Sequence, residues 1–197
     1  LNGTPADCVQ VGLYDILKKK PRLVISGINV GENIGHGWIL SSGTVGAAME
    51  ASIDGIKSIS ISLHIPLKIK AETDFFDLNN CSIFENSAKI SAKLIKIFID
   101  TDFGYHIDLI SVNVPFDATI SSEFEITKPF RDPYGKLFHR IGEKYKHINP
   151  PTLFNNLKHG TDMKALSEGK ISITPISLEL CSKESIKELE QKIRNRW

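Results

Sequence analysis

Apolar residues in the first half of the chain follow two patterns, one typical of buried strands and one typical of helices. Runs with strand character occupy residues 22–28, 57–63 and 107–115. Apolar residues with helical spacing occupy residues 4–17, 43–55 and 85–99. Helices and strands therefore alternate along the chain. This order predicts an α/β fold of three layers, Rossmann-like, with a mainly parallel central sheet.

The pattern changes after Pro115. Residues 124–128 and 135–142 each have strand character, and the turn-rich sequence PFRDPYG separates them. We therefore predict that these two strands form a β-hairpin arm. Residues 145–162 show no regular period and are interpreted as irregular.

The end of the chain predicts one more strand and a last helix. Residues 169–180 alternate as in a strand, and residues 182–197 have the pattern of a capped terminal helix. We divide the chain accordingly. Residues 1–115 belong to the Rossmann-like core, and residues 116–197 contain the hairpin arm, the return strand and the C-terminal helix.

The first helix carries a clear start signal. Thr4 is a candidate N-cap, Pro5 stands at the first helical position, and Asp7 lies in the first turn, where the helix dipole favours a negative charge. We interpret Asp7 and Cys8 as structural residues of this helix.

Composition and charge exclude several classes of protein. The formal net charge of +1 provides no strong field that would draw the chain to nucleic acid or to a membrane. The three cysteines, Cys8, Cys81 and Cys181, form no C-x-x-C pair, so a structural zinc site is not expected. Scattered cysteines of odd number fit a reducing compartment and indicate a cytoplasmic protein.

The candidate chemistry lies in a segment rich in glycine and asparagine, residues 26–35, which follows the first predicted strand. Ligands of open α/β sheets bind at the carboxyl ends of strands. Asparagine oxygens can ligate a hard cation, and glycines let backbone amides approach an anion. Ser42, Gly43 and Thr44 then begin a helix, whose first amides and dipole favour a phosphate. Taken by composition alone, a phosphate cradle and a simple connecting turn remain equally open.

Two familiar phosphate-binding motifs are excluded. A P-loop requires a lysine before its final serine or threonine, and no lysine precedes Ser42 or Thr44. A dinucleotide-binding fingerprint requires G-x-G-x-x-G, whereas Gly27, Gly31 and Gly35 are spaced four apart. The glycine spacing therefore argues against a dinucleotide-dependent oxidoreductase.

The sequences SGINVGENIG and SSGTVGAAMEA resemble the signature of the SurE family of survival proteins, which are metal-dependent nucleotidases. GTPADCV, ISVNVP and GTDMKALSEGKISITPISLEL agree with the family as well and follow its order. The resemblance covers essentially the whole chain, at residues 3–9, 26–35, 41–51, 110–115 and 160–180.

The resemblance implies an activity, a cofactor and a set of site residues. It implies hydrolysis of nucleoside monophosphates, and of short polyphosphates in some members, with a divalent cation such as Mg²⁺ or Mn²⁺. It places a metal ligand at Asn29 and phosphate-binding elements at Asn33, Ser42, Gly43 and Thr44. It also implies a homodimer or homotetramer that assembles through the hairpin arm and the C-terminal segment.

The sequence departs from the family pattern in one respect. Family members hold the metal mainly with two adjacent aspartates and a serine near the N-terminus, and no Asp-Asp pair occurs here. The resemblance implies that the family's first strand, its paired aspartates and its serine ligand would all precede Leu1. We therefore expect the chain to be N-terminally truncated and nearly inactive alone, with its catalytic residues unknown. The alternative is a non-catalytic relative that binds nucleotide or phosphate weakly, or that only assembles.

Further polar residues have local explanations that compete with a functional one. Asp162 matches a family position, and we prefer to interpret it with Thr161 as a helix cap. His36 lies in the signature segment and is expected to be exposed. Arg131 and Asp132 match the family's arm, where we expect Asp132 to stabilise a turn.

Overall fold

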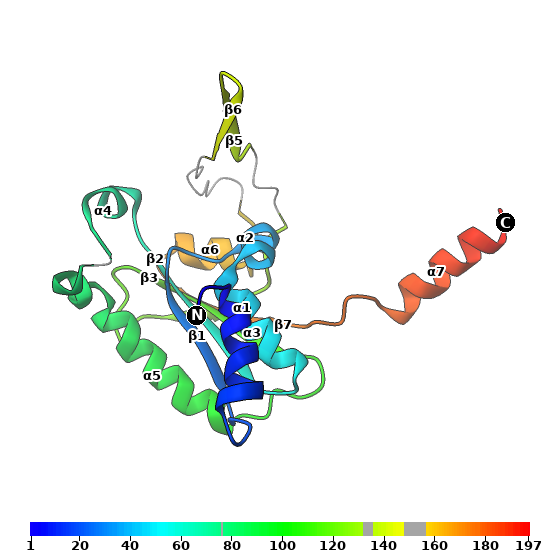
Figure 1. Cartoon of the computed structure of the whole chain (residues 1–197), viewed down its shortest axis with the longest axis horizontal. Coiled ribbons are helices and arrows are strands. Elements are labelled where there is room, and N and C mark those ends of the chain that lie inside the picture. The colour runs from blue at the N-terminus through cyan, green and yellow to red at the C-terminus, as the bar shows by residue number, and fades with distance from the viewer. Residues whose placement is uncertain (76, 132–135, 148–156) are drawn as a thin grey trace.

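The computed structural model describes residues 1–75, 77–131, 136–147 and 157–197. Its centre is a twisted five-stranded sheet of order β1-β2-β3-β7-β4, with helices on both faces (Figure 1). β1, β2 and β3 run parallel, β7 is antiparallel to β3, and β4 is parallel to β7. The strands are β1 (Val24–Val30), β2 (Ser58–His64), β3 (Leu109–Pro115), β4 (Phe124–Ile126) and β7 (Ile171–Ile176). The predicted α/β fold with a mainly parallel sheet is confirmed.

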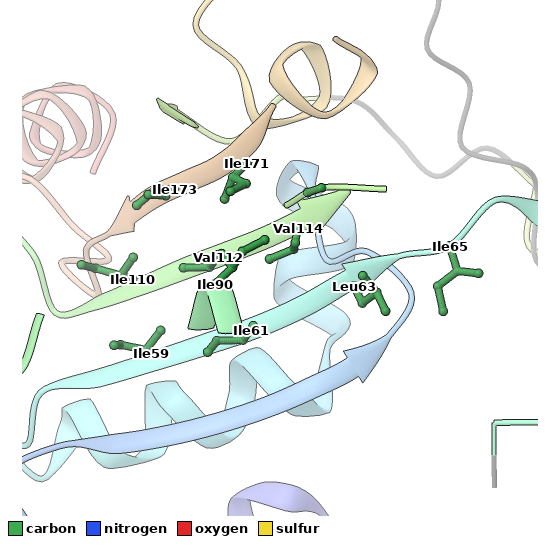
Figure 2. Packing of buried hydrophobic residues seen from close by; sticks show 11 residues of the cluster. Ile59, Ile61, Leu63, Ile65, Ile90, Ile110, Val112, Val114, Ile171 and Ile173 are labelled. Carbon is green, nitrogen blue, oxygen red and sulfur yellow. The ribbon is translucent and has the colours of Figure 1, made fainter. Parts of the chain in front are cut away.

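The helices form the two outer layers. α3 packs on β1 and β2 with α1 outside it, and α5 covers the opposite face (Figures 1 and 2). The helical segments are α1 (Pro5–Val11), the π-helical turn η1 (Gly12–Ile16), α2 (Gly35–Ser41), α3 (Gly43–Ile53), α4 (Leu67–Glu72), the 3₁₀ segment η2 (Leu78–Phe84), α5 (Glu85–Asp100), α6 (Asp162–Ser167) and α7 (Lys183–Arg194). Among the described residues, every helix is too short or too polar to cross a lipid bilayer.

The first helix begins as the sequence predicts. The Thr4 hydroxyl accepts a hydrogen bond from the Asp7 amide, and the Asp7 carboxylate accepts one from the Thr4 amide, with Pro5 between them. This reciprocal capping box satisfies two amides that the helix cannot bond itself. Asp7 is therefore structural, as expected. Cys8 is exposed in the same helix.

The predicted hairpin is wrong in its partners. Residues 124–128 do not pair with the described residues 136–142, because β4 joins the central sheet beside β7. The hairpin consists instead of β5 (Phe138–Ile141) and β6 (Lys144–His147), joined by a two-residue turn, and it projects from the body (Figure 1). Most of β6 falls in the segment that the sequence pattern assigns to irregular structure, although a tight glycine turn between short strands is itself a hairpin signal.

The two faces of the sheet differ in chemistry. Toward α5, branched apolar side chains from three strands pack around Ile90 (Figure 2). Toward α3, the same strands carry small polar side chains, and α3 meets them with Ala47, Ala48 and Ala51. The buried polar residues of this face are Ser58, Ser60, Ser62, Ser111, Asn113, Ser172 and Thr174. Small groups on both sides allow the helix to approach the sheet closely.

β1 contains a bulge that decides where Asn29 lies. Ser26 pairs with Ser60 and Asn29 pairs with Ser62, so β1 has one extra residue between these two pairs. Paired residues of parallel strands point to the same face, and Asn29 therefore stands in a row with Ser62 and Asn113. The bulge places the asparagine on the polar face of the sheet, at the carboxyl end of the strands.

Candidate functional site

The segment that links β1 to α2 crosses the carboxyl ends of the parallel strands. Every second backbone amide of this segment is held by a different element. Gly31 donates to Leu63 O of β2 at 2.9 Å, Asn33 donates to Asn113 Oδ1 of β3 at 2.8 Å, and Gly35 donates to Asp162 Oδ2 of α6 at 2.6 Å. The glycine-rich segment is thus a fixed part of the structure.

Asn33 is buried at the centre of this segment. Its Nδ2 donates to Ser62 Oγ at 2.7 Å, and its carbonyl accepts from Asn113 Nδ2 at 3.2 Å. Buried polar groups need such partners, and Asn33 finds them on two neighbouring strands. The described contacts give Asn33 the role of an anchor. Its expected contact with phosphate stays a prediction.

Asn29 is half-buried at the end of β1. Its side-chain amide donates to Gly31 O at 2.7 Å. Because a carbonyl only accepts hydrogen bonds, the group that faces Gly31 O is Nδ2, and Oδ1 occupies the other branch of the amide. An amide oxygen in this position is a suitable ligand for a hard cation.

The start of α3 has the features of an anion site. Ser42 caps the helix, with its hydroxyl accepting from the Val45 amide at 3.1 Å. The Gly43 and Thr44 amides precede the hydrogen bonds of the helix itself, and neither has a side-chain or loop partner among the described residues. Pro5 of α1 lies so close that a Cβ on Gly43 would come within 3.1 Å of its ring.

The start of α2, only a few residues earlier, is closed to an anion. Its first amide, that of Gly35, is bonded to Asp162, and the next, that of His36, donates to Phe130 O at 2.9 Å. His36 is exposed, as expected, but it belongs to this helix and not to a loop. It also lines a pocket of about 280 Å³ together with Ile39 and Leu178. Of the two consecutive helix starts, α3 is the better candidate for phosphate.

Asp162 has a larger role than the sequence indicates. Thr161 is the N-cap of α6, which agrees with the predicted cap, and Asp162 also accepts from the Met163 amide at 2.8 Å. Asp162 is fully buried, and it accepts further hydrogen bonds from Gly35 and from Phe130. Burial raises the pKa of the carboxyl, and the three backbone hydrogen bonds oppose that rise.

Sequence reasoning did not single out Ser62 and Asn113 as site residues. Both stand at alternate positions of otherwise apolar buried strands, and that polar alternation was the available signal. A histidine–glutamate pair also lies at this edge of the sheet. His64, the last residue of β2, contacts Glu32 with 3.1 Å between Nδ1 and Oε2.

The remaining candidates are less informative. Arg131 is exposed, and Asp132 lies outside the described residues. Within the described ranges, no group of three or more histidine, cysteine, aspartate or glutamate side chains is arranged to hold a metal ion. Asn29 therefore fits one position of a cation's coordination shell and does not make a site with its described neighbours.

The expected position of the metal-binding aspartates, before Leu1, stays a prediction. Leu1 is exposed and stands outside the regular structure, three residues before the N-cap of α1. The described residues that follow it supply no adjacent pair of aspartates. Among the described residues, none is therefore assigned to the metal-binding role expected of such a pair, and the catalytic residues stay unknown.

Comparison with known proteins finds the same similarity over nearly the whole chain. The family model described as "Survival protein SurE" matches residues 1–136. Two curated relatives, both named 5'-nucleotidase SurE, come from Methanocaldococcus jannaschii and Methanocella arvoryzae. The first is 41% identical over 91% of this chain and 66% of its own length. The second is 32% identical over 100% of this chain and 75% of its own length.

A solved structure gives the same result for the fold. The crystal structure of the SurE protein from Aquifex aeolicus matches with a TM-score of 0.71 and 30% sequence identity, covering 96% of this chain and 74% of that one. The chain thus spans about two thirds to three quarters of the length of these relatives.

Proposed function

Because this chain belongs to the SurE family, we propose that it forms the phosphate-binding part of a metal-dependent nucleotidase. The reaction is hydrolysis of a nucleoside 5'-monophosphate to nucleoside and phosphate, with 3'-monophosphates and short polyphosphates as further substrates. The names of the two curated relatives support the reaction class. The observation that carries the proposal is the start of α3, where the Gly43 and Thr44 amides have no side-chain or loop partner among the described residues.

Phosphate is held at the start of α3 in this proposal. The Gly43 and Thr44 amides and the Thr44 hydroxyl donate to its oxygens, with Ser42 capping the helix at the same point. The positive end of the helix dipole favours the dianion. The same donors stabilise charge that develops on the transferred phosphoryl group, because they are already oriented before reaction. Asn33 is a further phosphate-binding residue in this proposal, and its bonds to two strands hold it in place.

The metal is a divalent cation, Mg²⁺ or Mn²⁺, with Asn29 Oδ1 as one ligand. A bound cation supplies Lewis-acid polarisation of the phosphoryl oxygens. One neutral ligand is insufficient for a divalent ion, which takes several oxygen ligands and prefers carboxylates. We propose that the other ligands come from outside these 197 residues, and that the chain by itself is only weakly active.

The assembly is a homodimer or homotetramer in this proposal, built by residues 116–197, with residues 1–115 as the nucleotidase core. Two features support it. The β5–β6 hairpin and α7 both project from the body (Figure 1). Three apolar residues of α7 are exposed at helical spacing, namely Ile186, Leu189 and Ile193.

The test measures phosphate release from AMP and GMP, with and without Mn²⁺. The chain of 197 residues is compared with the longest product of its gene, and Asn29→Ala is introduced into the longer protein. We expect metal-dependent turnover by the longer protein, a loss of about 10- to 100-fold in kcat/KM for Asn29→Ala, and little activity of the 197-residue chain.

A second candidate function is that of a non-catalytic relative that binds phosphate or nucleotide weakly or only assembles. It is favoured by the lack of a clustered ligand set within the described residues. If the longest product releases no phosphate with or without metal, this second function replaces the enzyme. If the 197-residue chain is as active as the longer protein, the proposal that further ligands lie outside it is wrong.

A further inference from the structure

We infer that Asp162 is a positioning residue of the phosphate site. Its buried carboxylate fixes the start of α2 and the backbone at Phe130, and through α2 it fixes the point at which α3 begins. The inference rests on the proposed function, since it assigns another residue to the same site.

The contacts of Asp162 join three separate segments. Its Oδ2 accepts from the Gly35 amide at 2.6 Å, and its Oδ1 accepts from the Phe130 amide at 2.9 Å and from the Met163 amide at 2.8 Å. The side chain is fully buried. A buried carboxylate is stable only when hydrogen bonds replace its hydration, and here backbone donors of three segments do so.

Asp162 is not a ligand of the phosphate itself. A buried negative charge repels a phosphate, and the Asp162 oxygens are already bonded to backbone amides. Its effect must therefore pass through the elements that it holds.

The path to the phosphate site runs through α2. Gly35 is the first residue of α2, and Ser42 is both the C-cap of α2 and the N-cap of α3. Because Gly35 and Ser42 are the two ends of one short helix, we expect a shift of the Gly35 amide to move Ser42 as well. The position of the Gly35 amide therefore determines where Ser42, and with it the Gly43 and Thr44 amides, meets a phosphate.

The junction around the carboxylate is closely packed. Gly35 has a φ of +67°, and a Cβ there would lie 3.1 Å from Phe130 O, so the backbone of α2 touches the backbone at Phe130 directly. Ile34 is fully buried beside Met163 and Leu166 of α6. The Asp162 carboxylate therefore lies in a closely packed junction between α2, α6 and the backbone at Phe130.

The number of donors explains why a carboxylate is needed. Three amides converge on two oxygens. An asparagine offers one oxygen, and its Nδ2 would face a backbone N–H, which leaves donors opposed. Asp162→Asn therefore keeps the shape of the side chain and removes the link to at least one segment.

The test uses Asp162→Asn and Asp162→Ala in the longest product of the gene, with Thr161→Ala as the matched control. Thr161→Ala removes the cap of the same helix and leaves the bonds to Gly35 and Phe130 in place. Three quantities are measured well below the melting temperature. They are the hydrogen-exchange rate of the Gly35 amide, the Kd of inorganic phosphate from shifts of the Gly43 and Thr44 amides, and kcat/KM for AMP with Mn²⁺.

For Asp162→Asn we expect exchange at Gly35 to accelerate at least about tenfold, and Kd and kcat/KM to worsen by about 10- to 100-fold. Thr161→Ala should lower the melting temperature and change Kd and kcat/KM less than about twofold. The inference is overturned if Asp162→Asn and Thr161→Ala change Kd equally, or if Asp162→Asn leaves the Gly35 exchange rate unchanged. If the wild-type protein binds no phosphate, the proposed function fails, and the exchange rate still decides whether Asp162 holds α2.

Discussion

Glu168 at the end of α6 lies between two lysines. Its carboxylate is 3.0 Å from Lys164 Nζ and 2.9 Å from Lys170 Nζ. The hydrogen bonds to Lys170 and then Lys164 lower the pKa of Glu168 to about 2. A carboxyl group whose pKa is lower in the folded chain than in the unfolded chain stabilises the fold when it is ionised.

The pH dependence of stability follows with a definite sign. The contribution of Glu168 is fully present above its ordinary pKa of 4.5 and is lost as the pH falls toward about 2. We expect Glu168→Gln to lower the melting temperature at pH 7 and to lose less thermal stability than the wild type between pH 4.5 and 2. Thermal melts across this range measure it, with Glu184→Gln on α7 as the control for net charge. Parallel curves for the wild type and Glu168→Gln would contradict the prediction.

Sequence distance separates the residues that could be predicted from those that could not. The Thr4–Asp7 capping box spans three residues and is visible locally. Asp162 and Gly35 are 127 residues apart, and Asn113 and Asn33 are 80 residues apart. Only the fold brings such partners together, so the sequence indicated a cap at Asp162 and no role for Asn113.

Gly27 is the clearest constraint on a single strand. It has a φ of +123°, and a Cβ there would lie 2.2 Å from Ile61 O of β2. We expect Gly27→Ala to destabilise the protein by more than about 2 kcal/mol, because the new methyl group meets backbone and the conformation disfavours any side chain.

Urea denaturation measures the effect, and Gly46→Ala is the control. Gly46 lies within α3, where a Cβ meets nothing within 4 Å. That variant should be neutral or more stable by up to about 1 kcal/mol, because alanine is the better helix former. Equal denaturation midpoints for Gly27→Ala and the wild type would show that the bulge tolerates a side chain.

The bulge also explains why the pattern of β1 could not place Asn29. Counting alternate residues from Ser26 assigns Asn29 to the face opposite Ser62, whereas the extra residue of the bulge brings the two into one row. The existence of the strand was predictable, because an apolar run needs only local residues. The insertion was not, because it is defined by pairing with β2.

The pattern was weakest where chain segments pair across long gaps. The order helix, strand, helix, strand predicted the parallel core, since each crossover joins neighbours. β4 and β7 are separated by more than forty residues, and the choice between a hairpin and a place in the sheet was decided by packing.

At the scale of the whole molecule, α7 predicts association. Its apolar stripe is exposed, with Leu189 at 59%, and a helix of this length is marginal in water without packing. We expect the wild type to form dimers or larger species and its melting temperature to rise with protein concentration. Leu189→Glu should yield monomers in analytical ultracentrifugation.

Gln191→Glu adds the same charge on the opposite side of α7 and should leave the association unchanged. A monomeric wild type at all concentrations, or equal effects of the two variants, would exclude α7 from the interface.

The two faces of the sheet also carry a consequence for how the protein can change over evolutionary time. Along β2, the residues at odd positions, such as Ile59 and Ile61, pack with α5 among aliphatic side chains. Substitution of one aliphatic residue by another of similar volume costs little stability at such positions. Residues at even positions, such as Ser60, lie under the alanines of α3 and admit only side chains of similar size. Mutational tolerance should therefore oscillate with a period of two along this strand, with drift confined to one side of the sheet.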